Sequence, residues 1–333
     1  MPEPCGAPAA GRSLVNAPRM LIGFLFGLVS AVANGSSNIL GAVAVRRTGV
    51  LVAPMAVLTI ALVFMGLFAW LAGLPFVFGL EDMPLLLILG AMVALGFILF
   101  YKALQLGPVS VVSSITATSG AAAVLFAVVL LNEHPSPLQW LAVPVSTVGA
   151  VLATRARRPP GAARGDIGMG PVYAALTVLT GGCSNALIRI PIVEHGPVQA
   201  IVVQRFFTVV FIILLVAAIA LLRRHGARRL YADEARTAPV PVPEIVPHPR
   251  DRGGWQATVV LLVLMGAIDA TGFIGFAFGM AVAPAWLLGL VSQSGRLAAA
   301  FVATAVFREN LRPVQWIGIG LVALGLALAV VPI

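Results

Sequence analysis

Charged side chains are scarce in this chain of 333 residues, since Asp, Glu, Lys and Arg together make up only 10% of it. Soluble globular domains carry about a quarter of charged residues. Hydrophobic residues account for 60% of the chain, and the mean hydropathy is +1.02. Such a composition cannot cover a water-facing surface. It therefore excludes a soluble domain and makes a lipid bilayer the main solvent.

Cysteine and histidine are also rare, because the chain has only Cys5 and Cys183 and four histidines, which fall between apolar runs. This scarcity argues against a disulfide framework and a zinc-type cluster, so we expect no metal and no cofactor. The sequence also lacks a Gly-rich phosphate loop, a nucleophile paired with histidine, and paired carboxylates. Neither an enzyme nor an ATP-driven pump is expected.

Continuous apolar runs dominate what remains, and their length of about 20 residues suits membrane-spanning helices, whereas barrel strands would alternate apolar and polar residues. The sequence predicts an all-α integral membrane protein with ten transmembrane helices, at 20–45, 50–72, 84–104, 108–131, 138–154, 168–190, 197–222, 256–280, 284–307 and 313–332. The remaining segments are a disordered N-terminal tail at 1–19, a basic linker at 155–167, and a long basic, Pro-rich loop at 223–255.

An internal repeat relates the two halves of the chain, 20–154 and 168–333. Pro108 precedes Glu133 by 25 residues, and the Gln139-Trp140 pair follows six residues later. Pro284, Glu309 and Gln315-Trp316 repeat this spacing 176 residues further on. Each half has five predicted spans, and an odd number makes the second half enter the membrane from the opposite side. This pattern predicts two inverted five-helix repeats, a plan typical of secondary transporters.

The segments "YKALQLGPVSVVSSI" and "LLNEHPSPLQWLAVPVSTVGA" and their second copies resemble the EamA-type repeat of the drug/metabolite transporter superfamily. "QRFF" at Arg205 is similar to an arginine that this family often carries near the start of a repeat's second helix. The resemblance implies a ten-helix carrier of small metabolites, often an exporter, that works without ATP hydrolysis. The residues given a structural role by the motif are Pro108, Glu133, Gln139, Trp140, Arg205, Pro284, Glu309, Gln315 and Trp316.

Charges inside the predicted spans are the most informative residues, because burying one in a membrane costs a few kcal/mol or more. Asp269 lies near the middle of the eighth span and Arg296 near the middle of the ninth. We predict that they form a pair lining a central cavity, with Asp269 as a proton site and Arg296 as an anion clamp; a structural salt bridge is the alternative. The predicted substrate or proton pathway comprises Asp269, Arg296, Asn34, Asn38, Asn185, Ser292 and Gln293.

The sequence thus indicates a multi-pass secondary transporter of a small metabolite in the cell membrane, with a bacterial cytoplasmic membrane expected. The alternatives are a lipid-linked substrate flippase on the same fold and a non-transporting membrane scaffold or enzyme. Expected partners are a small-molecule substrate and membrane lipids but no nucleic acid, with a homodimer left open. Most of the 21 basic residues lie in or beside the connectors after odd-numbered spans, which predicts that these connectors are cytoplasmic.

Overall fold

The computed structural model of the protein describes residues 9–48, 52–74, 82–106, 109–154, 169–224, 253–295 and 313–330. Within these ranges all regular secondary structure is helical, which confirms the all-α prediction. Among the described helices, eight are long and apolar enough to cross a membrane. The protein is therefore a multi-pass helical membrane protein.

The described helices follow the predicted spans closely. Those of the first half are α1 (Ala9–Thr48), α2 (Val52–Leu71), α3 (Met83–Leu106), α4 (Val109–Thr116), α5 (Ser119–Leu131) and α6 (Pro137–Ala153). Those of the second half are α7 (Gly170–Leu187), α8 (Arg189–His195), α9 (Pro197–Arg224), α11 (Gly253–Val282), α12 (Ala285–Gln293) and α14 (Pro313–Val330). The predicted ninth span is described only as far as 295.

Two differences from the sequence prediction concern the start of one helix and a break within another. Helix α1 begins at Ala9 and runs through Pro18, so residues 9–19, expected in a disordered tail, are helical. The predicted fourth span is divided into α4 and α5 by a break at Ala117 and Thr118. Near this break the hydroxyl of Thr118 donates to the carbonyl of Ile115 and that of Ser119 to the carbonyl of Thr116. Such local bonds compete with the helical ladder and favour a break there.

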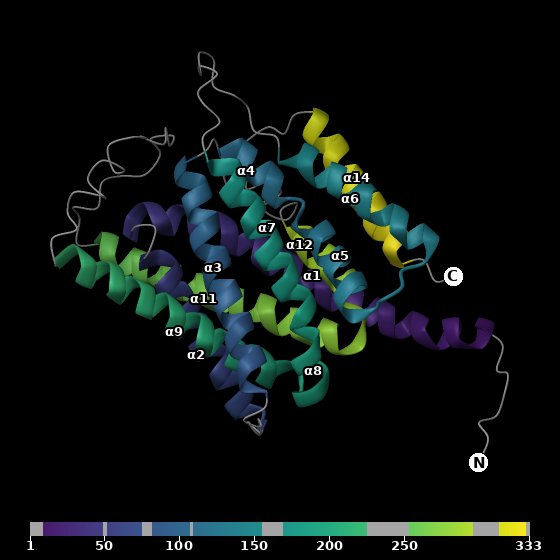
Figure 1. Cartoon of the computed structure of the whole chain (residues 1–333), viewed down its shortest axis with the longest axis horizontal. Helices are drawn as coiled ribbons and strands as arrows, with labels where there is room; N and C mark the ends of the chain where they lie inside the picture. The colour runs from purple at the N-terminus through teal and green to yellow at the C-terminus, as the bar shows by residue number, and fades with distance from the viewer. Residues whose placement is uncertain are drawn as a thin grey trace.

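The helices of the two halves interleave, as Figure 1 shows, instead of forming two separate bundles. Helix α1 packs on α11, α3 packs on α7 and α9, and α2 packs on α11 and α9. Helices α5 and α12 meet at the centre, and α6 and α14 lie side by side at one edge of the molecule. Large apolar side chains such as Val63, Trp70 and Val129 remain exposed on the outer surface, as expected for helices that face lipid.

Glycines allow α6 and α14 to approach closely. A side-chain carbon at Gly149 would lie 2.7 Å from the carbonyl oxygen of Gly318, and one at Gly325 would lie 2.9 Å from the backbone nitrogen of Ser146. Such distances leave no room for a larger residue at either position. Small residues that bring backbones together are the usual basis of helix association in membranes, where apolar burial gives little driving force.

Candidate functional site

A single turn of α9 carries three buried polar side chains, Gln204, Arg205 and Thr208. The Nε2 amide of Gln204 donates to the hydroxyl of Ser184 on α7, at 3.3 Å. The hydroxyl of Thr208 donates to the carbonyl oxygen of Gly90 on α3, at 3.2 Å. Arg205 extends towards α11. This turn therefore links α9 to three neighbouring helices through polar contacts in the membrane interior.

The contact between Arg205 and α11 is a buried ion pair. The Nη2 atom of Arg205 lies 3.0 Å from Oδ2 of Asp269. Only 3% of the arginine side chain and 12% of the aspartate side chain are exposed. The guanidinium carbon lies 3.9 Å from the ring centre of Phe273, one helical turn beyond Asp269, which adds a cation–π contact. The Nη1 atom is buried and has no hydrogen-bond partner in the described part of the chain. The site thus holds a neutralised charge pair with one donor group unused.

The sequence predicts a pair of Asp269 and Arg296, but Arg296 lies outside the described residues and that pairing stays a prediction. The observed partner is Arg205, for which the motif implies a structural role. The signal that marked Asp269 also marks this arginine, because it is a charge within an apolar span. The sequence alone did not predict a role for the buried polar residues Gln204 and Thr208. They lie beside Arg205 in the segment "QRFFT".

Other predicted pathway residues are placed only in part. Asn34 donates from Nδ2 to the hydroxyl of Ser30, at 3.1 Å. It faces α11, because a side-chain carbon at Gly272 would lie 3.3 Å from its Oδ1 atom. Asn185 is partly buried on α7, and Ser292 is buried near the end of α12. The side chains of Asn38 and Gln293 lie outside the described part.

Glu133, from the end of the fourth predicted span, caps the start of α12. Its Oε1 accepts the backbone N–H of Ala285 at 2.8 Å, and its Oε2 accepts that of Trp286 at 2.9 Å. The first N–H groups of a helix have no partner inside it, and a carboxylate there is also stabilised by the helix dipole. Pro284 precedes these two residues as the N-cap. A side chain from the first half of the chain thus caps a helix of the second half.

Arg189, at the start of α8, completes this junction. Its Nε atom lies 3.4 Å from Oε1 of Glu133, and its Nη1 atom donates to the carbonyl oxygens of Met280, at 3.0 Å, and of Ala283. These carbonyls lie at and just beyond the C-terminal end of α11, where a cation is favourable. The pair therefore joins the end of α11 and the start of α12 to the end of α5.

We expect the Glu133→Gln substitution to lower the free energy of unfolding by about 1–3 kcal/mol, because it weakens charge-assisted hydrogen bonds and leaves Arg189 without its counter-ion. Thermal unfolding of the purified protein in detergent measures this effect. Glu194→Gln is the matched control, since the side chain of Glu194 on the neighbouring α8 is 57% exposed. Equal melting temperatures for the two variants would contradict the role of Glu133 as a cap.

The remaining motif residues that the structure describes lie near the starts of α6 and α14. Gln139 and Ser136 form a capping box at the start of α6, with the Ser136 N–H donating to Oε1 of Gln139 at 2.9 Å. Trp140 and Trp316 are 39% and 54% exposed on the outer surface. Gln315 donates to the carbonyl oxygen of Ala153, at 3.4 Å. Pro108 and Glu309 lie outside the described residues.

One cluster of charged groups lies where α8 ends and α3 begins. The Nε2 atom of His195 is 3.0 Å from Oδ1 of Asp82 and 4.0 Å from Oε2 of Glu194. The three ligand-type atoms lie within 4.8 Å of one another, so this group has the atoms needed to hold a cation. The 3.0 Å contact between His195 and Asp82 joins α8 to the start of α3 as an ion pair when the histidine is protonated.

Comparison with known proteins agrees with this fold. No curated protein matches the sequence. Among solved structures, 29 chains match, and one crystal structure superimposes with a TM-score of 0.65 at 16% sequence identity, covering 94% of this chain and 98% of its own. At that identity the likeness shows the fold alone. The sequence model of the EamA-like transporter family matches residues 21–155. This match confirms the resemblance to the EamA-type transporters over residues 21–155.

Proposed function

We propose that the protein is a secondary transporter that moves a small metabolite by alternating access, with ten membrane spans in two inverted five-helix repeats. The observation that carries the proposal is the ion pair of Arg205 and Asp269, buried inside the helical bundle of a chain with an EamA-like unit. Ionisable groups within membrane spans are rare, face the interior of the bundle and mark substrate, ion or proton pathways. The membrane we expect is the bacterial cytoplasmic membrane.

Equivalent glycine contacts support the inverted repeat. A side-chain carbon at Gly90 on α3 would lie 2.6 Å from Cβ of Phe207 on α9. One at Gly266 on α11 would lie 2.7 Å from Cβ of Ile60 on α2. The two glycines are 176 residues apart, which is the offset of the sequence repeat, and the two contact residues are 147 apart, which is the offset between the starts of the halves. The same contact is thus made twice with the halves exchanged.

The contact between α6 and α14 supports the same symmetry. Gly149 approaches Val322, whose first-half equivalent is Ser146, and Gly325, the equivalent of Gly149, approaches Ser146. Helix contacts also recur with the halves exchanged. The contact of α1 with α11 corresponds to that of α7 with α3, and the contact of α2 with α11 corresponds to that of α9 with α3. Symmetric packing of this kind is the basis on which two halves rock about a shared central site.

The ion pair offers a mechanism that couples substrate to protons. With Arg205 bound, Asp269 has its charge neutralised within the bundle. A substrate anion that competes for the guanidinium leaves a carboxylate buried without a counter-ion, and such a group favours taking up a proton. Binding of the anion and of a proton then become one event. Arg296, Asn34, Asn38, Asn185, Ser292 and Gln293 are proposed as further residues of this pathway.

We expect Asp269→Asn to abolish the dependence of transport on a proton gradient, because asparagine keeps the shape of the side chain and the contact with Arg205 but cannot titrate. The experiment follows uptake and efflux of a metabolite panel in vesicles, with and without the gradient. Glu194→Gln removes a titratable group at the surface and is the control. Gradient-dependent transport that persists in a normally expressed Asp269→Asn protein would make Asp269 a structural residue.

Membrane topology is predicted by the repeat and by the distribution of basic residues. In a variant without native cysteines, cysteines at Arg158 in the linker and His248 in the long loop should react with impermeant thiol reagents only from the cytoplasmic side. A cysteine at His134, between α5 and α6, should react only from outside. Labelling of positions 134 and 158 from the same side would overturn the five-helix repeats, and a reversed pattern would overturn only the orientation.

A further inference from the structure

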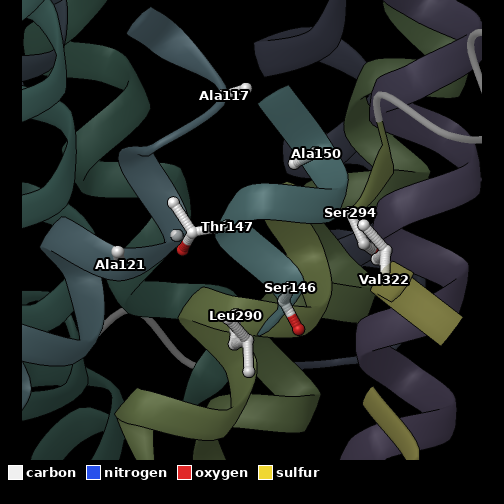
Figure 2. A pocket seen from close by; sticks show the side chains of 9 residues that line it. Ala117, Ala121, Ser146, Thr147, Ala150, Leu290, Ser294 and Val322 are labelled. Carbon is white, nitrogen blue, oxygen red and sulfur yellow. The ribbon is translucent and has the colours of Figure 1, made fainter. Parts of the chain in front are cut away.

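A small cavity lies where the two halves meet. Its volume is about 20 Å³, and side chains from α5, α6, α12 and α14 surround it, together with Ala117 at the break between α4 and α5. Figure 2 shows Ser146 and Thr147 of α6, Leu290 of α12 and Ser294 around this space. A cavity of this size accommodates about one water molecule, since roughly 10–15 Å³ suffices.

The hydroxyl of Ser146 is the group in this cavity that needs a partner. Ser146 is 4% exposed, and its Oγ atom is buried without a hydrogen-bond partner in the described part of the protein. By contrast, the hydroxyls of Thr147 and Ser294 donate to carbonyl oxygens of their own helices, those of Val143 and Val291. Both retain lone pairs that can accept a further bond. An unpaired hydroxyl inside a membrane protein is unfavourable, and a water molecule would remove that cost.

A helix break and a helix end border the same space. Ala117 belongs to the break between α4 and α5, and Ser294 follows the last residue of α12. Residues 118 and 294 are 176 apart, so the break and the end of α12 fall at equivalent positions of the repeat. The backbone N–H groups of Ala117, Thr118 and Ser294 donate to carbonyl oxygens one turn earlier. The hydroxyl of Ser146 is therefore the group that a water would bond there.

We propose that this cavity holds one structural water, bound by Ser146, and that this water serves as a hinge element between the interrupted fourth span and the end of α12. Water is the ligand that fits, because the lining residues that the structure describes include no carboxylate and the volume suits a single small neutral molecule. A mobile water can exchange hydrogen bonds between Ser146, Thr147 and Ser294 while the spans bend. The hinge role rests on the proposed transport function, whereas the presence of the water does not.

Radiolytic footprinting of the full chain in detergent tests for the water directly, because radicals formed from a bound water label the side chain beside it. Leu290 is the reporter, since it lines the cavity and is 4% exposed. We expect strong oxygen labelling of Leu290 from isotopically labelled water despite its burial. Ala150→Val, which fills the cavity, should reduce this labelling several-fold, and Ser36→Ala, which removes a hydroxyl bonded within α1, should not. An unlabelled Leu290, or equal labelling in Ala150→Val, would mean a dry cavity and overturn the proposal.

Transport kinetics in vesicles test the hinge. With any solute that the wild-type protein carries, Ser146→Ala should slow turnover at saturating substrate several-fold and leave the half-saturating concentration unchanged, because a hinge does not touch the substrate. Unchanged turnover in Ser146→Ala would remove the hinge role. A wild-type protein that carries no solute but shows labelled Leu290 would refute the transport function and with it the hinge role, and would leave the bound water established.

Discussion

Replacing Asp269 by leucine is expected to lower the free energy of unfolding by about 3–5 kcal/mol, because it leaves a buried charge without its partner. The charge that remains is Arg205, 3% exposed on α9. Arginine cannot lose its proton in a protein, so this variant has no way to neutralise the site. Chemical or thermal unfolding in detergent measures the loss.

The double substitution Asp269→Leu with Arg205→Met separates stability from transport. Removing both charges should restore most of the stability, since a buried ion pair often contributes little more than an apolar pair of similar volume. Transport should be absent in the double variant, because neither charge of the proposed pathway remains. A double variant as unstable as Asp269→Leu alone would show that the destabilisation comes from lost packing and not from an uncompensated charge.

Replacing Gly318 by alanine is expected to destabilise the protein by about 1–3 kcal/mol or more, because it forces α6 and α14 apart. The added carbon would lie 2.5 Å from the backbone nitrogen of Ala153 and 2.7 Å from the carbonyl oxygen of Gly149. Both are backbone atoms, so no flexible side chain can move to relieve the clash. The melting temperature in detergent should fall clearly.

Gly320, two residues further along α14, provides the matched control. A side-chain carbon there would meet nothing within 4 Å, so Gly320→Ala should be neutral or slightly stabilising through helix propensity. The two variants have the same composition and differ only in the face of α14 that carries the methyl group. Equal melting temperatures would show that the close approach of α6 and α14 contributes nothing to stability.

Much of this architecture follows from composition and from the spacing of residues along the chain. Scarce charge and apolar runs of bilayer length placed the helices to within a few residues, with α1 and the divided fourth span as the differences. The spacing of Pro284 from Pro108, and of Gln315 from Gln139, predicted a repeat whose glycine contacts recur in the packing. The charge of Asp269 within an apolar span indicated it as a candidate pathway residue. The prediction of the helices succeeds because it depends on composition and on position along one chain, whereas the repeat and the role of Asp269 stay predictions.

Which residues of different helices meet depends on how the helices pack. Asp269 binds Arg205, 64 residues away, and Glu133 caps a helix that begins 152 residues later. Sequence periodicity tells which residues share one face of a helix, but it does not tell which helix lies opposite. In a soluble protein an apolar stripe identifies the inward face, whereas a membrane helix is apolar all round and carries no such stripe. The partners of Asp269 and Glu133 therefore became visible only once the helices were packed.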